Sequence, residues 1–269
     1  MSMKYALAIG VSMLVLGSTA AKADKLDDII SSGTLRCGVV LDFPPMGSRD
    51  GNNNPVGFDV DYCNDLAKSL GVAPEIVETQ FPDRIPALMS DRVDVVVGST
   101  SDTLERAKTV GFSIPYFAFE YVLLTKKDSG INSWEDAKGK NIGAISGTFE
   151  AVQAEKDVKS WGAGSFKGYQ SQNDTILAVD QGHVDASVSV SSVVAATIGS
   201  GKFPSLIMGP KIPYPTDYVA LAVAREEYGL INYLNLFINQ QVRTGRYAEL
   251  YKKYFSAEAP SLMTGAVYR

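Results

Sequence analysis

The chain has 269 residues, of which 45% are hydrophobic and 20% are charged, and its formal net charge is −5 at pH 7. An acidic chain with charges of both signs argues against a nucleic-acid partner and against an anionic membrane surface. The length is enough for one large domain or for two lobes of roughly 100–150 residues each.

The first 23 residues have the pattern of a secretory signal peptide. Lys4 precedes an uncharged, largely apolar segment, Tyr5–Leu16, and small residues lead to Ala21-Lys22-Ala23. This apolar segment is too short to span a bilayer and is followed by an A-x-A cleavage pattern. A buried N-terminal helix is the alternative. We therefore predict a signal peptide at 1–23 and a periplasmic location, with a formal charge of −7 once Lys4 and Lys22 are removed.

The two cysteines, Cys37 and Cys63, would both meet an oxidising compartment after export. Cys37 lies in an expected strand, Leu35–Val40, and Cys63 lies on the apolar face of an expected helix that should pack on the first sheet. We predict a disulfide between them. Two buried free thiols that behave as small apolar residues are the alternative.

Strands and helices alternate along the chain. A strand at Leu35–Val40 is followed by a helix that Asp59 should cap and that should end at Leu70. The next strands, near Pro74–Glu78 and in VDVVVG, are apolar without alternation, which favours a parallel sheet covered on both faces. The later stretch NDTILAVDQGHVDASVSV repeats the pattern of DRIPALMSDRVDVVVG. Two similar halves of this kind predict two α/β lobes.

Several kinds of chemistry have no support in the sequence. The one histidine, His183, stands in an expected turn, and no second histidine or cysteine lies at metal-ligand spacing. Gly162-Ala163-Gly164 does not have the spacing of a dinucleotide loop, and no phosphate-binding loop of the P-loop type is present. We therefore expect neither a metal nor a cofactor. An enzyme that uses a pair of carboxylates stays open.

Arg106 stands where a helix is expected to begin. Asp102 and Glu105 have the spacing of a capping box, which predicts a helix start near Thr103. A cation in the first turn opposes the helix dipole, so an anion should offset it. We predict a carboxylate or another anion held by Arg106, the hydroxyl of Ser101 and free backbone N–H groups. An exposed arginine paired with Glu105 or Asp102 is the alternative.

A matching turn occurs in the second half. The sequence ISGTFEAV predicts a strand, a Gly-Thr turn and a helix, so the hydroxyl of Thr148 and the amide of Phe149 offer a second place for an anion. One such place in each lobe would allow both lobes to close on one ligand.

Two aromatic residues are candidates for the same site. Phe43 lies on the loop after the first strand, where the carboxyl ends of α/β strands present their sites. Phe58 lies just before a helix, and its alternative role is a hydrophobic staple against Cys63.

Several longer stretches resemble the bacterial extracellular solute-binding proteins, family 3, which are the polar amino-acid receptors of ABC importers. The signature-like segment is GFDVDYCNDLAKSL at Gly57–Leu70, with Tyr62 where an aliphatic residue or phenylalanine is usual. The resemblance continues in RIPALMSDRVDVVVGSTSDTLERAKTVGFSIPYF, GKNIGAISGT and RTGRYAELYKKYF, and it covers the chain after residue 23 in the order of the family.

The resemblance implies an α/β fold of the two-lobed periplasmic binding protein type (type II-like), with each lobe a βα sandwich and a strand hinge between them. The expected division is 24–120 for the first part of lobe 1, 121–218 for lobe 2, and 219–269 for the completion of lobe 1. It also implies a receptor, not an enzyme, that works as a monomer and delivers its ligand to an ABC permease.

The resemblance further implies roles for individual residues. Arg106 would hold the α-carboxylate of the ligand, assisted by Ser101 and by the turn at Thr148 and Phe149. The rings of Phe43 and Phe58 would enclose the ligand. The carbonyl of Ser99 would contact its ammonium group.

One departure from the family pattern concerns this ammonium group. Val190 stands where amino-acid receptors usually place an aspartate, and a buried ammonium without an anion would cost several kcal/mol. Either another acid substitutes, with Glu120 and Asp42 as candidates, or the ligand has no free primary α-ammonium. An exposed hinge position is the alternative for Glu120.

Two further functions occur among proteins of similar sequence. One is a cyclohexadienyl dehydratase, which eliminates water and carboxylate from a ring acid. The other is an accessory protein of a periplasmic oxidase. The receptor remains the leading hypothesis, with an amino acid or an amino-acid derivative as the ligand.

Overall fold

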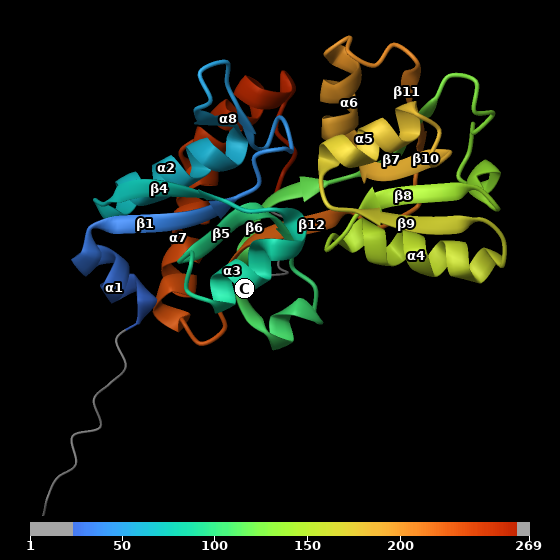
Figure 1. Ribbon diagram of the computed structural model, residues 1–269. Coiled ribbons are helices and arrows are strands. Elements are labelled where there is room, and N and C mark those ends of the chain that lie inside the picture. The colour runs from blue at the N-terminus through green and yellow to red at the C-terminus, as the bar shows by residue number, and fades with distance from the viewer. Residues whose placement is uncertain (1–23, 263–269) are drawn as a thin grey trace, which may run out of the picture.

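A computed structural model describes residues 24–262 of the chain, and the predicted signal peptide lies outside them. The polypeptide forms two α/β lobes that lie side by side, each built around a five-stranded sheet (Figure 1). Within residues 24–262, no helix combines the length and the apolar character that a membrane span requires.

The first sheet has the strand order β4-β1-β5-β12-β6. Its strands are β4 (Ala73–Glu78), β1 (Thr34–Val39), β5 (Val95–Ser101), β12 (Asp217–Ala224) and β6 (Val110–Phe119). The pairs β1–β4 and β1–β5 are parallel, but β12 runs antiparallel to both β5 and β6. The expectation of a parallel sheet is therefore wrong for the part formed by β5, β12 and β6. Strand β12 enters the sheet from the other lobe and does not follow a helical crossover.

The second sheet has the strand order β11-β7-β10-β8-β9 and is also mixed. Its strands are β11 (Leu206–Lys211), β7 (Tyr121–Lys126), β10 (Ala186–Val190), β8 (Asn141–Ile145) and β9 (Ser165–Tyr169). A short hairpin, β2 (Ser48–Arg49) with β3 (Pro55–Val56), lies in the loop after β1.

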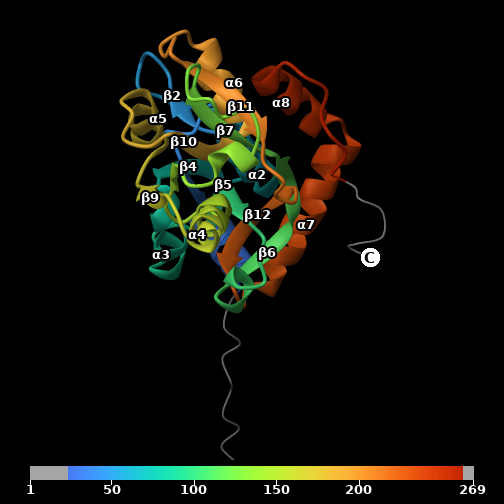
Figure 2. The same cartoon turned by 90° about the vertical axis from the view of Figure 1, so that its right-hand side faces the viewer.

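Helices cover both faces of each sheet, as the two perpendicular views show (Figures 1 and 2). The helices of the first lobe are α1 (Lys25–Ser32), α2 (Phe58–Leu70), α3 (Arg84–Met89), α7 (Tyr228–Arg243) and α8 (Arg246–Phe255). Those of the second lobe are α4 (Phe149–Trp161), α5 (Gln172–Asp180) and α6 (Ser191–Gly199). Short 3-10 turns occur at η1 (Phe81–Asp83), η2 (Arg106–Lys108) and η3 (Glu135–Ala137).

The chain passes between the sheets twice. It leaves the first sheet where β6 ends at Phe119 and enters the second where β7 begins at Tyr121. It returns between Lys211, the end of β11, and Asp217, the start of β12. The last helices, α7 and α8, then pack on the first lobe. The lobe boundaries at 120 and 218 stay predictions, although the sheets change at these two places.

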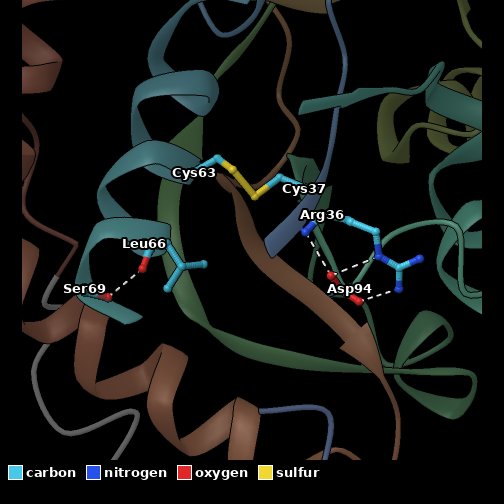
Figure 3. The surroundings of a disulfide bond; sticks show 6 residues. All are labelled: Arg36, Cys37, Cys63, Leu66, Ser69 and Asp94. Carbon is cyan, nitrogen blue, oxygen red and sulfur yellow. Dashed lines mark hydrogen bonds and ion pairs between the residues drawn. A yellow bond between two sulfur atoms is a disulfide. The ribbon is translucent and has the colours of Figure 1, made fainter. Parts of the chain in front are cut away.

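The predicted disulfide is present and ties β1 to α2 (Figure 3). Cys37 and Cys63 are both fully buried, with their Cα atoms 6.3 Å apart. Beside it, both the backbone amide and the guanidinium of Arg36 donate to Asp94. A covalent link and a partly buried ion pair thus stabilise the same end of the first sheet.

Helix α2 begins two residues earlier than expected. Gly57 is its N-cap, and Asp59, which we expected to cap it, lies in the first turn. The side chain of Asp59 points inward and is 1% exposed, and it accepts a hydrogen bond from the hydroxyl of Tyr116 at 2.8 Å. Burial raises the pKa of this carboxyl to about 8.

Candidate functional site

A narrow pocket lies between the two lobes. Its lining comes from both sheets and from the strands that join them: Phe43, Phe81, Ser99, Ser101, Phe119, Tyr121, Thr148, Glu150, Val190 and Asp217. The free space between its walls is about 10 Å³, roughly that of one water molecule. The lobes must therefore move apart before a solute can enter between them.

Three phenylalanine rings form the apolar wall of the pocket. Phe43 follows β1, Phe81 opens η1 after β4, and Phe119 ends β6, so segments from both edges of the first sheet contribute to this wall. The ring centroid of Phe43 lies 4.8 Å from that of Phe81 and 6.2 Å from that of Phe119, both edge to face. Such a wall favours an apolar stem or a cation next to the ring faces.

Two buried acids form the polar wall. The hydroxyl of Tyr121 donates to Oδ2 of Asp217 at 2.6 Å and lies 3.4 Å from Oε2 of Glu150. Burial raises the pKa of Glu150 to about 7, and burial likewise raises the pKa of Asp217. Neither acid makes an ion pair within the described residues.

Arg106 lies beside the pocket, not among the residues that line it. Its Nη1 donates to the carbonyl of Ser101 at 3.1 Å, and its Nη2 donates to the carbonyl of Gly147 in the second lobe at 2.7 Å. Two of its five N–H groups are thus engaged with the backbone, which leaves others for a ligand anion. The alternative of a pair with Glu105 is not what the structure contains, since Glu105 pairs with Lys108 at 2.5 Å.

The helix expected near Thr103 does not form. Arg106 begins only a 3-10 turn, Arg106–Lys108, with Glu105 before it. A helix dipole therefore has no part in the electrostatics of this arginine. Its position next to the pocket follows instead from the end of β5, which places Ser101 and the loop after it at the cleft.

A second arginine, Arg84, lies deeper and is 2% exposed. Its Nη1 donates to the carbonyls of Gly98 at 2.6 Å and Ser99 at 2.7 Å, and its Nη2 donates to the carbonyl of Gly147 at 3.1 Å. Burial, followed by the charge of Arg106, lowers its pKa to about 9. Arg84 thus holds the backbone at the end of β5 and also reaches the second lobe.

The Gly147-Thr148 turn closes the pocket from the second lobe. The hydroxyl of Thr148 donates to the carbonyl of Ile145 at 2.8 Å and accepts from the amide of Ala151 at 3.2 Å, as an N-cap of α4 does. The ring of Phe149 stacks against Tyr121, with centroids 6.1 Å apart. The turn is formed as predicted, while its hydroxyl already serves the helix.

Phe58 does not lie in the pocket. It is fully buried in the first lobe, where its ring contacts Tyr62 and Phe117 at 5.7 and 5.1 Å between centroids, and also rings of α8. The prediction that it encloses a ligand is wrong for this geometry. Phe58 is the first residue of α2 and packs in an aromatic core, so it is not the staple residue before the helix that we gave as the alternative. Phe81 takes the place opposite Phe43 instead.

The two acids proposed as substitutes for the missing aspartate are engaged elsewhere. Asp42 accepts a hydrogen bond from the amide of Gln172 at the start of α5, at 2.9 Å. Glu120 is exposed between β6 and β7 and pairs with Lys211 at 2.7 Å. Val190 does line the pocket, and its side chain is apolar there.

Of the other predicted residues, the pocket brings together Phe43, Ser99, Ser101 and Thr148. The residues that sequence reasoning missed are Phe81, Arg84, Phe119, Tyr121, Glu150 and Asp217. Some signal existed for two of them, since Glu150 follows the Gly-Thr turn directly and Asp217 lies where the chain returns to the first lobe. Within residues 24–262, no group of three or more histidine, cysteine, aspartate or glutamate residues has the arrangement of a metal site.

A pocket enclosed between two α/β lobes that are joined by strands is the arrangement of binding proteins that close around a solute by a hinge motion. Residues 35–257 match the model of the bacterial extracellular solute-binding proteins, family 3, and the chain belongs to this family.

Known relatives and solved structures cover most of the chain. An arginine-binding extracellular protein of Bacillus subtilis is 29% identical over 95% of this chain and 99% of its own length. The crystal structure of a mutant of ArgBP from T. maritima is 31% identical, with a TM-score of 0.78, and covers 87% of this chain and 100% of that one. An ancestral amino acid-binding protein, a precursor of cyclohexadienyl dehydratase, is also 31% identical, with a TM-score of 0.77 and coverage of 86% and 99%.

Proposed function

We propose that this protein is the periplasmic receptor of an ABC importer and that it traps a small carboxylate-bearing solute, an amino acid or an amino-acid derivative, between its lobes. The observation that carries the proposal is the pocket between the lobes, with Arg106 at its side and residues of both sheets in its lining. The arginine-binding relative supports the same class of ligand.

Arg106 is the proposed partner of the carboxylate. Its guanidinium is fixed by two backbone carbonyls, one in each lobe, so that its remaining N–H groups have a set direction. A planar guanidinium binds a carboxylate through two parallel hydrogen bonds, which is stronger and more directional than a single charge. The second lobe closes onto the same arginine, so binding of the ligand favours the closed arrangement of the lobes. The permease then meets a monomeric receptor whose shape depends on whether ligand is bound.

The test is a binding measurement on protein refolded to remove carried ligand. A thermal-shift screen of the twenty L-amino acids, followed by calorimetry on those that raise the melting temperature, should find at least one ligand. Arg106→Ala should then weaken the binding of that ligand about 30-fold or more. Arg243→Ala, at an exposed position of α7, is the matched control and should bind as the wild type does. Unchanged affinity in Arg106→Ala would contradict the proposal.

One observation favours a second candidate, an enzyme on the same fold. Glu150 is a buried carboxyl in the pocket whose pKa is raised to about 7, which suits a general acid. The proposal of a receptor without catalysis therefore needs its own check. Incubation with prephenate or arogenate should yield no aromatic product, and product formation that Glu150→Gln abolishes would favour a dehydratase.

A further inference from the structure

The pocket contains two acids for which the described residues supply no cation at ion-pair distance. Glu150 is 5% exposed and Asp217 is 9% exposed, and their side-chain contacts are with hydroxyl groups. Burying an ionised carboxylate without an ion-pair partner is costly. The charges of Arg106 and Arg84 act on Asp217 from a greater distance, and an ammonium group of a ligand would do so at hydrogen-bond distance.

Ser101 places Asp217 next to the arginine that is the proposed carboxylate partner. Its carbonyl accepts from Arg106 at 3.1 Å, and its hydroxyl donates to Asp217 at 3.0 Å. One residue therefore joins a guanidinium and a carboxylate side by side. A ligand group with a carboxylate and an ammonium on the same carbon presents the complementary pair of charges at this short separation.

Two other places in the pocket are unsuitable for a cation. Val190 offers an apolar side chain. The carbonyl of Ser99 accepts from Nη1 of Arg84 at 2.7 Å, so a second cation there would meet the charge of a buried guanidinium. The cation of a ligand is thus directed to the wall that Asp217 and Tyr121 form.

We propose that Asp217, held by the hydroxyls of Tyr121 and Ser101, is the partner of the α-ammonium group of the ligand, and that the protein selects solutes with a free amine over their deaminated counterparts. This inference rests on the proposed function, because it takes the carboxylate of the same ligand to lie on Arg106. Asp217, on β12, would thus take over the role of the aspartate that the family usually has at the position of Val190, on β10.

The experiment compares each of the twenty L-amino acids with the deaminated acid of the same side chain, on ligand-free wild-type protein. The variant is Asp217→Asn, which keeps an oxygen that can accept from Tyr121 and removes the charge. Glu120→Gln is the matched control, because it removes the charge of an exposed acid between the lobes. Melting temperatures of all three proteins establish that they are folded.

The amine-bearing member of a pair should bind about 10- to 100-fold more tightly than its deaminated counterpart, and Asp217→Asn should lose most of this difference. Glu120→Gln should keep it. A deaminated acid that binds the wild type as tightly as the amino acid overturns the inference, and so does an unchanged preference in folded Asp217→Asn. If Asp217→Asn does not fold, the comparison on the wild type decides. If neither the amino acids nor their deaminated counterparts bind, the proposed function fails as well. Binding that depends on Arg106 but not on the amine contradicts only this inference and agrees with the proposed function.

Discussion

Nη2 of Arg106 in the first lobe donates to the carbonyl of Gly147 in the second lobe, at 2.7 Å. Arg84 donates to the same oxygen at 3.1 Å, so two cations of one lobe converge on one backbone carbonyl of the other. A carbonyl carries only a partial negative charge, and two guanidinium groups that share it repel each other. Glu150 and Asp217 offset part of this repulsion, and a carboxylate of the ligand on Arg106 would offset more of it, which links the closed arrangement to an anionic group on the ligand.

Replacement of Gly147 by alanine should favour the open arrangement of the lobes. Gly147 has a φ of +80°, and a Cβ there would lie 3.0 Å from Cα and 3.2 Å from N of Pro82 in the first lobe. The left-handed conformation costs about 1 kcal/mol for alanine, and contact with backbone atoms of the other lobe adds to this only when the lobes are closed. Ligand affinity, measured by calorimetry, and closure, measured by small-angle scattering with ligand, should both decrease.

Gly162→Ala is the matched control for this change. Gly162 also has a positive φ, +67°, and ends helix α4 of the same lobe, but a Cβ there would have no atom within 4 Å. It should lower the free energy of unfolding by a similar amount, about 1 kcal/mol, and leave ligand affinity unchanged. If both variants bound equally well, the contact of Gly147 with Pro82 would have no part in closure.

Substitutions at Phe58 and Phe81 should separate stability from binding. Phe58→Ala removes a fully buried ring from the core of the first lobe and should cost about 3–5 kcal/mol of unfolding free energy, with the folded protein still binding its ligand. Phe81→Leu changes the wall of the pocket and should weaken ligand binding more than it lowers stability. Urea denaturation and calorimetry measure the two effects, and a loss of affinity in folded Phe58→Ala would return that residue to the site.

The difference between these two phenylalanines illustrates what the sequence can and cannot predict. Both are the first residue of a helical segment, and local pattern gives no sign of which ring faces the cleft. The disulfide was predictable, because an apolar strand and an apolar helix face bring Cys37 and Cys63 to one interface. The alternation of strands and helices likewise indicated two α/β lobes.

The acids of the pocket were not predictable from local pattern. Asp217 becomes part of the site only because β12 returns to the first sheet beside β5, which brings it to Ser101, 116 positions earlier in the chain. Arg106 was identified through a helix dipole that does not exist, although the residue does lie at the pocket. Pairings between distant strands determine these contacts, and they are not encoded in the spacing of neighbouring residues.

Asp59 should make the folded protein less stable as the pH rises. Its pKa is raised to about 8 in the folded protein by burial, from an ordinary value of 3.8, so the folded state keeps a proton that the unfolded chain releases. The free energy of unfolding should therefore decrease between about pH 4 and pH 8. Glu150 and Asp217 contribute with the same sign, so the difference from Asp59→Asn isolates the effect of Asp59.

Urea denaturation at several pH values between 5 and 8.5 measures this contribution. Asp59→Asn should show a shallower decrease than the wild type, since an amide keeps an acceptor for Tyr116 but does not titrate. Asp27→Asn, at an exposed position of α1, is the control and should follow the wild type. Equal slopes for Asp59→Asn and the wild type would show that the buried carboxyl is ionised throughout this range.

Glu150 should make the affinity for an amine-bearing ligand increase with pH. Burial raises its pKa to about 7, and its surroundings are Tyr121 and Asp217 on the hinge strands, Arg84 on α3 and Thr148 at the start of α4. Below pH 7 the carboxyl of Glu150 is protonated. A ligand cation nearby favours the ionised form, so binding of the ligand releases this proton. The dissociation constant of an amino acid should therefore fall about tenfold between pH 5.5 and pH 7.5.

In Glu150→Gln the fall should be smaller, with only Asp217 left to titrate, and the deaminated acid of the same side chain should bind no more tightly as the pH rises. A pH dependence that is identical in Glu150→Gln and the wild type would place the titrating group elsewhere.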